Sequence, residues 1–251
     1  MPPEDFTDQL RSLGLNTGDA VLMHSSMKAL GTQKTPLEFI NDIITVLGPE
    51  GTLLVPALSY KYVTDERPYF SVAETEPCIG LIPVTFFHME GTVRSIHPTH
   101  SVCAIGRHAR EIISRHFFDE TPVGPNSPFM KLPEYGGKLL FIGNILKSCT
   151  FMHGVEEIAG TPYTLKKEKT RYFIKDRDGH VSEKDMYGHD FTGWNQEYQR
   201  IRDILQYPDI KTGKIGQADC FLINSAVLKE KALEKFREDP LYFVSKAAID
   251  L

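Results

Sequence analysis

The sequence predicts an α/β fold, with a single layered domain over residues 1–251 and a central mixed β-sheet flanked by helices. Short apolar runs alternate with segments of helical periodicity along most of the chain. No segment has the composition of an interdomain linker. The stretch TRYFIKDRDGHVS at 170–182 has the pattern of an antiparallel hairpin with Asp178-Gly179 as its turn. This hairpin favours a mixed sheet over a purely parallel one.

In the first half of the chain, turn and capping residues separate the predicted elements. Gly14 ends a first helix, and Thr35-Pro36 supplies an N-cap and a proline at the first helical position of a second helix that stops at Gly48. Residues 58–78 are polar and irregular, which predicts a long loop. The predicted helices are 5–13, 36–47 and 80–90, and the predicted strands are 20–24 and 52–57.

The second half continues the alternation. Asn224 is a strong N-cap residue and opens a last helix that runs to about Phe236. The predicted strands are 101–106, 138–143 and 215–223, and the other predicted helices are 107–117, one that begins near 149, and 195–206.

Composition excludes several classes of function. The 251 residues are 41% hydrophobic, which is enough for one large core. A net charge of −5 argues against a nucleic-acid-binding protein, because such proteins usually have a basic face. No apolar run reaches the roughly 18 residues of a membrane span, and the N-terminus lacks a signal-peptide pattern, so we expect a cytoplasmic protein without a membrane partner. Four cysteines without a CxxC pair predict neither a disulfide framework nor a structural zinc site.

The segment VLMHSSMKALG at 21–31 offers a candidate phosphate site. A buried strand ends in His24-Ser25-Ser26 and a helical turn follows. Backbone N–H groups and hydroxyls at the end of such a strand can bind phosphate oxygens, and Lys28 would add a positive charge. The alternative is a plain N-cap between strand and helix, since neither a GxGxxG nor a Walker pattern is present.

The segment RSIHPTHSVCAIG at 94–106 places His97 and His100 around a Pro-Thr pair, directly before a strand. Three interpretations stay open for these histidines. They form a ligand-binding loop, they supply part of a metal site in a hydrolase that also uses His153, or they hydrogen-bond the backbone of a rigid loop. Metal sites usually need three or four ligands, so the HxxH spacing alone is a weak indication of metal.

The segment SCTFMHGVEE at 148–157 contains the candidate general base. His153 and Glu156 lie at i and i+3 of a predicted helix, so the carboxylate can fix the tautomer of the imidazole while the other ring nitrogen accepts a proton. Glu157 points elsewhere and could contact a substrate. Cys149 lies at i−4 from His153, which leaves open a cysteine nucleophile and an acyl-enzyme. The plain alternative is a helix first turn with an inert buried cysteine.

Together these segments resemble the aminoglycoside 3-N-acetyltransferase family of acetyl-CoA-dependent enzymes. They occur in the family's order and span most of the chain. The matching segments are GDAVLMHSSMKALG (18–31), GPEGTLLVPALSY (48–60), RSIHPTHSVCAIGRHA (94–109), TPVGPNSPFMKL (121–132), GGKLLFIGNILKSCTFMHGVEE (136–157) and GKIGQADCFLI (213–223).

The resemblance implies residue roles as well as a fold. It implies direct acetyl transfer from acetyl-CoA to an amine, without a metal, with His153 as general base and Glu156 as orienting acid. It places His24, Ser25 and Ser26 on the CoA pyrophosphate, and the loop from His97 to Ser101 along the cofactor channel. The Thr150 hydroxyl is a further candidate, for the tetrahedral oxyanion.

The chain differs from the family in the loops where we expect the acceptor. Residues 59–70 and 182–201 match the resistance enzymes poorly, and their acids, among them Asp65 and Asp190, are interleaved with basic and aromatic residues. The acceptor is therefore an aminoglycoside or another small-molecule amine, and the protein is a monomer or a homodimer. Two further alternatives are the Cys149-dependent hydrolase or transferase and a non-catalytic CoA-binding module.

Overall fold

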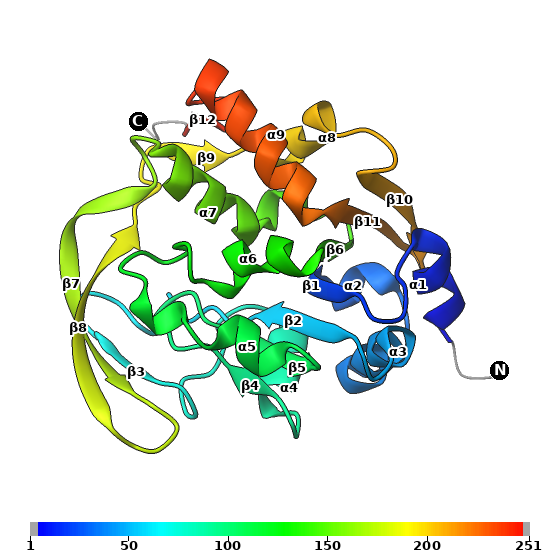
Figure 1. The fold of residues 1–251 in the computed structure, drawn as a ribbon, viewed down its shortest axis with the longest axis horizontal. Helices are drawn as coiled ribbons and strands as arrows, with labels where there is room; N and C mark the ends of the chain where they lie inside the picture. Colours follow the sequence, from blue (N-terminus) through cyan, green and yellow to red (C-terminus); the bar gives the residue numbers. More distant parts are fainter. Residues whose placement is uncertain (1–4, 248–251) are drawn as a thin grey trace.

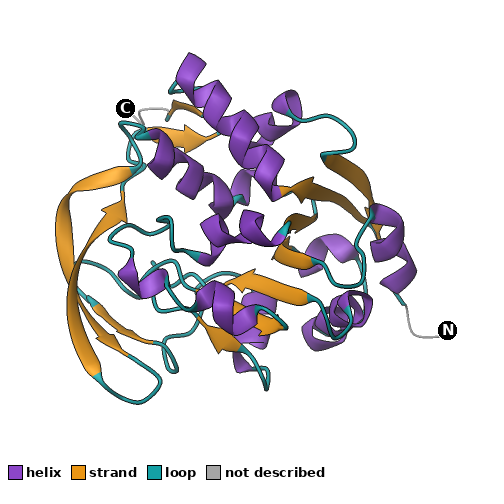
Figure 2. Cartoon of the chain, viewed as in Figure 1, coloured by secondary structure: helices purple, strands orange, loops and turns teal. Residues whose placement is uncertain are grey.

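The computed structural model describes residues 5–247 and is built around a seven-stranded sheet with the order β10-β11-β6-β1-β2-β5-β4 (Figures 1 and 2). Strand β1 is parallel to β2 and β6, and every other neighbouring pair is antiparallel. The predicted mixed sheet is therefore confirmed. Its strands are β1 (Ala20–Ser25), β2 (Thr52–Pro56), β4 (Val93–Arg94), β5 (Val102–Gly106), β6 (Lys138–Ile142), β10 (Ile210–Ile215) and β11 (Ala218–Asn224).

Helices cover both faces of this sheet because successive strand residues point to opposite sides. In β1, Val21 and Met23 pack into one apolar cluster, whereas Leu22 packs into the other. The first cluster contains α1 (Thr7–Leu13), α2 (Met27–Leu30), α3 (Pro36–Leu47) and α4 (Leu81–His88). The second contains α5 (Ala109–Ile113), α6 (Pro128–Lys131), α7 (Thr150–Ala159), α8 (Ile201–Ile204) and α9 (Ser225–Glu238).

The predicted hairpin exists, but it lies outside the central sheet. Strands β7 (Leu165–Lys175) and β8 (Val181–His189) pair with each other, and β7 also pairs with β3 (Tyr69–Ser71). This three-stranded sheet curves along one side of the molecule in Figure 1 and has an apolar cluster of its own, which includes Phe70 and Tyr172. The mixed character of the central sheet comes instead from β4, β5, β10 and β11.

Two predicted helices are wrong in part. Residues 107–117 form the short α5 and a separate 3-10 turn at His116–Phe118. Residues 195–206 contain the end of β9 (Trp194–Gln196), a 3-10 turn at Tyr198–Arg200 and only one turn of α-helix, α8. Pairing of β9 with β12 (Val244–Lys246) explains the second difference, because a distant partner overrides local helical periodicity.

Five strands of the described residues were not predicted because they are short or polar. Strands β3, β9 and β12 have three residues each, and β4 has two. Strand β10 (IKTGKI) is an edge strand with polar side chains, which the apolar-run criterion does not detect. Within residues 5–247, no helix has the length and apolarity that a membrane span requires.

The N-cap of α3 gives a test of the local physics. Thr35 accepts a hydrogen bond from the Glu38 backbone N–H, and the Glu38 side chain bonds back to the Thr35 N–H, which forms a capping box. We expect Thr35→Ala to lower the free energy of unfolding by about 1 kcal/mol in urea denaturation. Thr45→Ala, at an exposed position in the last turn of the same helix, is the matched control and should cost less, since alanine has the higher helix propensity. Equal losses in the two variants would contradict this account of the cap.

Candidate active site

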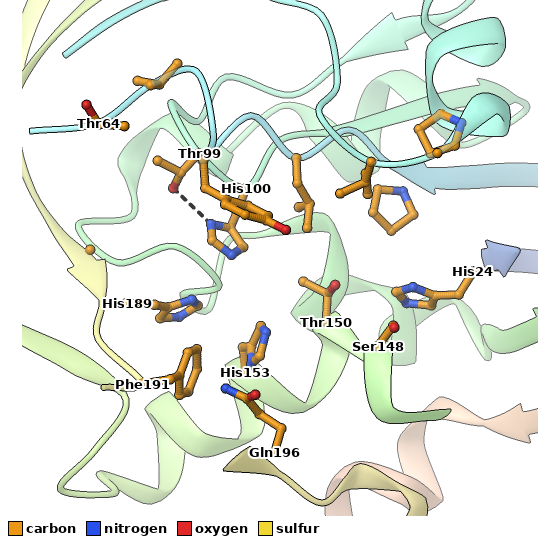
Figure 3. A pocket seen from close by; sticks show the side chains of 18 of the residues that line it. His24, Thr64, Thr99, His100, Ser148, Thr150, His153, His189, Phe191 and Gln196 are labelled. Carbon is orange, nitrogen blue, oxygen red and sulfur yellow. Dashed lines mark hydrogen bonds between the residues drawn. The ribbon is translucent and has the colours of Figure 1, made fainter. Parts of the chain in front are cut away.

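A cavity of about 760 Å³ opens where three parallel strands end. Strands β1, β2 and β6 run in the same direction, so their carboxyl ends meet at one edge of the sheet, where ligands bind in folds of this kind. His24, Ser25 and Pro56 line the cavity from this edge. Figure 3 shows the wall extending from His24 past Ser148 and Thr150 to His153, His189 and Gln196.

His153 of α7 is held by a buried hydroxyl and a buried carboxylate. Its Nδ1 lies 2.8 Å from the Tyr198 hydroxyl and 3.4 Å from Glu156 Oε2. The Tyr198 hydroxyl donates to the same Glu156 oxygen at 2.7 Å, and Tyr163 donates to Glu156 Oε1 at 3.1 Å. Glu156, the acid predicted to orient His153, is therefore connected to that ring mainly through the Tyr198 hydroxyl.

These bonds assign the tautomer of His153. A carboxylate only accepts hydrogen bonds, so the Tyr198 O–H donates a hydrogen bond to Glu156, and the Tyr198 oxygen accepts one from Nδ1–H of His153. Burial, together with the neighbouring Glu156 charge, raises the pKa of Tyr198 well above its ordinary value, so the phenol keeps this proton. The unprotonated Nε2 of His153 is then the nitrogen available to accept a proton in the cavity.

A second acid–histidine pair lies beside the first. His189 Nε2 is 2.7 Å from Glu157 Oε1, which also accepts the Val123 backbone N–H at 2.8 Å. Burial drives both groups toward their neutral forms, because it raises the pKa of Glu157 to about 7 and holds the pKa of His189 well below its usual range. His189 lines the cavity, whereas Glu157 stands behind it and supports the ring.

The loop before β5 is rigid and reaches the same edge of the sheet. His97 Nδ1 accepts the backbone N–H groups of Thr99 and His100, and its ring stacks on His116 with 4.8 Å between ring centroids. The Ser101 hydroxyl is also buried and bonds to Ala57 and Arg94. The structure thus brings Thr99 and His100, but neither His97 nor Ser101, to the cavity wall.

The segment after β1 is only partly in the cavity. His24 and Ser25 line it, whereas Ser26 precedes α2 and Lys28 is exposed, both outside the lining. The His24 ring stacks on Phe141, and burial lowers its pKa to about 3, so it offers a neutral imidazole. Its buried Nε2 has no hydrogen-bond partner among the described residues, so this atom is free to bond a ligand or a water molecule.

Residues 22–237 match the family described as aminoglycoside 3-N-acetyltransferase. The chain belongs to this family. The resemblance deduced from the sequence is therefore confirmed.

Relatives in the family cover most of this chain. Aminoglycoside N(3)-acetyltransferase IV of Salmonella is 29% identical over 246 residues, which cover 96% of this chain and 89% of that protein. Aminoglycoside N(3)-acetyltransferase IX of Micromonospora chalcea is 27% identical, with 86% of each chain covered. The AAC(3)-IVa apoenzyme structure is 28% identical with a TM-score of 0.78 and covers 95% of this chain and 89% of its own. The structure of AAC-IIIb with CoASH, 24% identical with a TM-score of 0.82, covers 97% of each chain and shares the fold.

The position of Cys149 argues against the cysteine-nucleophile hypothesis. Cys149 precedes α7, is fully buried, and does not line the cavity. Burial raises the pKa of its thiol to about 12, so it stays protonated at neutral pH. Thr150, the first residue of α7, does line the cavity.

Asp65 and Asp190, two of the acids predicted to contact the acceptor, differ in their position relative to the cavity. Asp65 lines the cavity, but it is bonded to Lys166 at 2.5 Å and to Thr170 at 2.6 Å. Asp190 is exposed outside the cavity lining and accepts the Thr192 backbone N–H.

The sequence analysis missed the two tyrosines that bond Glu156. Tyr163 follows the acid by 7 positions and Tyr198 by 42. Tyr198 lies in the stretch 195–206, for which the sequence predicts a helix, so no local pattern points to it. His189 could have been found only from its place in the poorly matching segment 182–201.

The raised pKa of Glu157 predicts a pH-dependent stability. The folded state binds the Glu157 proton more tightly than the unfolded state between pH about 4.5 and about 7, so this group's contribution to stability falls as pH rises through that window. Glu157→Gln keeps an accepting oxygen but does not ionise. We expect the free energy of unfolding of the variant, minus that of the wild type, to increase from pH 5 to pH 7 in urea denaturation. A difference that is constant or decreases would contradict the shift.

Proposed function

We propose that this protein transfers an acetyl group from acetyl-CoA to an amino group, with the 3-amino group of an aminoglycoside as the acceptor and His153 as general base. The observation that carries the proposal is the bonding of His153. Its Nδ1 is engaged by Tyr198 and Glu156, which leaves Nε2 as the free ring nitrogen beside a cavity of about 760 Å³.

The proposed reaction is a direct transfer. His153 Nε2 accepts a proton from the amine while the amine nitrogen attacks the thioester carbonyl. The new C–N bond forms, the C–S bond breaks, and the proton passes from His153 to the leaving thiolate. Glu156, through Tyr198, stabilises the imidazolium that forms between these steps. The transfer needs no metal, and binding both substrates in one cavity supplies orientation.

Thr150 is assigned to the developing oxyanion. It begins α7 and lines the cavity on the same helix as His153, three positions earlier. A hydroxyl at a helix N-terminus can donate to negative charge that forms on the carbonyl oxygen.

The β1 end of the cavity suits the donor substrate. His24, Ser25, Lys147 and Ser148 line it, and the unpartnered Nε2 of His24 needs a polar ligand atom. Acetyl-CoA carries amide groups along its pantetheine arm and phosphates beyond them, which these side chains can bind. This end therefore fits the co-substrate, whereas Thr64, next to Asp65 in the chain, lies across the cavity from His24 in Figure 3.

A second acceptor class follows from the charge of the cavity, which contains little uncompensated negative charge. Asp65 and Glu66 are the carboxylates among its described lining residues, and Asp65 is paired with Lys166. A polycation would gain less here than in a densely acidic pocket. The alternative acceptor is therefore an amine of lower charge, acetylated by the same chemistry.

A relative 29% identical to this chain has been solved with a gentamicin bound, in a variant with a histidine changed to alanine.

We propose that residues 1–251 act as one catalytic domain in the cytoplasm, as a monomer or a homodimer. The cavity supports a single domain, since its lining residues range from Met23 to Gln196 along the chain.

Free thiol release from acetyl-CoA, measured over a panel of aminoglycosides, simple aminosugars and amino acids, tests the proposal. We expect release with an amine of the panel, and a decrease in kcat of about 10²- to 10⁴-fold in His153→Ala. Cys149→Ala is the control for the rejected nucleophile and should retain activity. An aminoglycoside response supports the main proposal, and a response only to another amine supports the alternative.

Two results would overturn the assignment. Unchanged turnover in His153→Ala would remove the general base, and loss of turnover in a folded Cys149→Ala protein would restore the thiol mechanism. Absence of thiol release with every amine, while acetyl-CoA still binds, would favour the non-catalytic CoA-binding module.

A further inference from the structure

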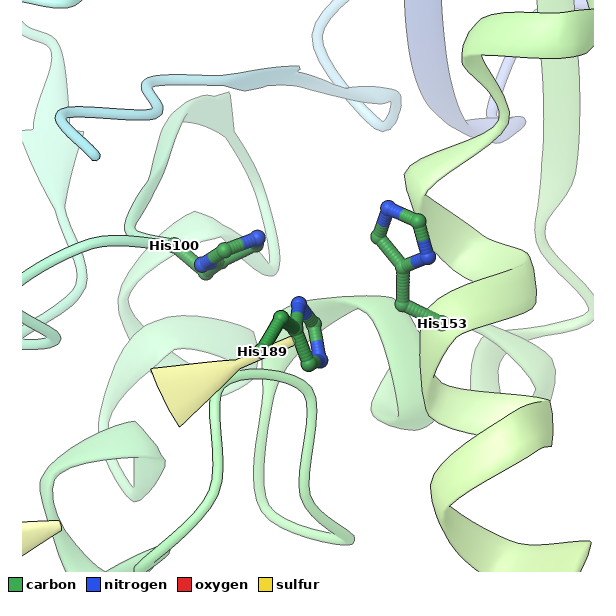
Figure 4. Close-up of side chains that lie close together, drawn as sticks. All are labelled: His100, His153 and His189. Carbon is green, nitrogen blue, oxygen red and sulfur yellow. The ribbon is translucent and has the colours of Figure 1, made fainter. Parts of the chain in front are cut away.

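Three histidines from distant parts of the chain meet at one wall of the cavity. His100 comes from the loop before β5, His153 from α7, and His189 from the end of β8 (Figure 4). One ring nitrogen of each lies within 4.8 Å of one from each of the others. The ring centroid of His189 is 4.7 Å from that of His100 and 4.9 Å from that of His153.

Each of these rings has one nitrogen bonded to an oxygen of the protein. His100 Nδ1 is 2.9 Å from the Thr99 hydroxyl, His153 Nδ1 is 2.8 Å from the Tyr198 hydroxyl, and His189 Nε2 is 2.7 Å from Glu157 Oε1. If each bonded nitrogen carries the proton, the lone pairs lie on Nε2 of His100, Nε2 of His153 and Nδ1 of His189. The last of these atoms is buried and has no hydrogen-bond partner among residues 5–247.

From this geometry we propose that His100, His153 and His189 form a binding site for a divalent transition-metal ion of the zinc type, and that the bound ion inhibits acetyl transfer. Three neutral imidazoles are a set of ligands that Zn²⁺ accepts in a tetrahedral site, with the fourth position left to water. The oxygen partners on the far side of each ring match the outer shell of such sites, where a carboxylate or other acceptor fixes the ligating tautomer.

Two carboxyl groups also stand behind these rings and hold them in place. Glu157 contacts His189, and Glu156 contacts His153 and Tyr198. Binding with Zn–N bonds of about 2.0–2.1 Å would bring these three nitrogens together around the ion.

Inhibition follows because one atom, Nε2 of His153, would be both a ligand of the ion and the proton acceptor of the proposed reaction. His153 cannot accept a proton at Nε2 while that lone pair coordinates an ion, so the ion is an inhibitor and not a cofactor. The inhibitory half of this inference rests on the proposed function, whereas the binding half does not.

Binding is measured first, without any substrate. Tag-free protein is treated with chelator, exchanged into chelator-free buffer, and titrated with Zn²⁺ in equilibrium dialysis with metal analysis. We expect one ion per chain. His189→Gln and His100→Gln should each weaken binding by at least about tenfold, since each removes a ligand. Thermal unfolding of each variant verifies that it is folded.

His180→Ala is the matched control, because His180 belongs to the other cluster of possible ligands, with Asp176 and Asp178 on the β7–β8 turn. It should leave binding unchanged. No binding to the wild type, or binding that His180→Ala abolishes and both glutamine variants retain, would overturn the site.

Inhibition is measured next, as thiol release with and without stoichiometric Zn²⁺. We expect loss of activity that excess chelator restores, and full activity in His180→Ala with the same zinc sensitivity. Zinc that binds at the three histidines without slowing turnover would overturn the inhibitory role. A protein that binds zinc but releases no thiol with any amine would instead contradict the proposed function, and the binding result would stand.

Discussion

The carboxylate of Glu156 is completely buried, and the active site depends on how its charge is accommodated. An ionised carboxylate away from water is costly unless donors surround it. Here the donors are the hydroxyls of Tyr163 and Tyr198, with Nδ1 of His153 at the edge of the group. The same hydrogen bonds that stabilise the buried Glu156 carboxylate also fix the His153 ring. The stability of this part of the core and the orientation of the proposed base therefore depend on the same bonds.

This arrangement connects parts of the chain that belong to different layers. Glu156 and His153 come from α7, which packs on the central sheet, whereas Tyr198 comes from the 3-10 turn after β9. His189, at the end of β8, brings the separate three-stranded sheet to the same wall and is held there by Glu157. Adjacent acids on α7 thus support one histidine each, one from the same helix and one from the neighbouring sheet.

Much of the fold could be predicted from the sequence because its elements have strong local signals. The capping box at Thr35 and the N-cap Asn224 mark α3 and α9, and apolar runs mark the buried strands β1, β2 and β6. Edge strands such as β10 lack that signal, since their side chains face solvent and their position is set by pairing with β11.

In the candidate site, as in the fold, residues close in sequence could be predicted and partners distant in sequence could not. His153 and Glu156 are neighbours on a helix and could be paired by spacing alone, and the motif resemblance pointed to them as well. Tyr198 acts from 45 positions beyond His153, and its role is set by tertiary structure. The predicted cofactor ligands His97 and Ser101 are hydrogen-bonded within a buried loop. His97 accepts the backbone N–H groups of Thr99 and His100, and the Ser101 hydroxyl donates to the Ala57 carbonyl.

The central claim is that Glu156, through Tyr198, holds His153 with its proton on Nδ1. The ring ¹⁵N chemical shifts of His153 in the neutral form measure this directly, with the signals assigned by comparison with His153→Ala. The account predicts a protonated Nδ1 and an unprotonated Nε2. A neutral ring with its proton on Nε2 would contradict it, because the nitrogen that faces the cavity would then have no lone pair with which to accept a proton.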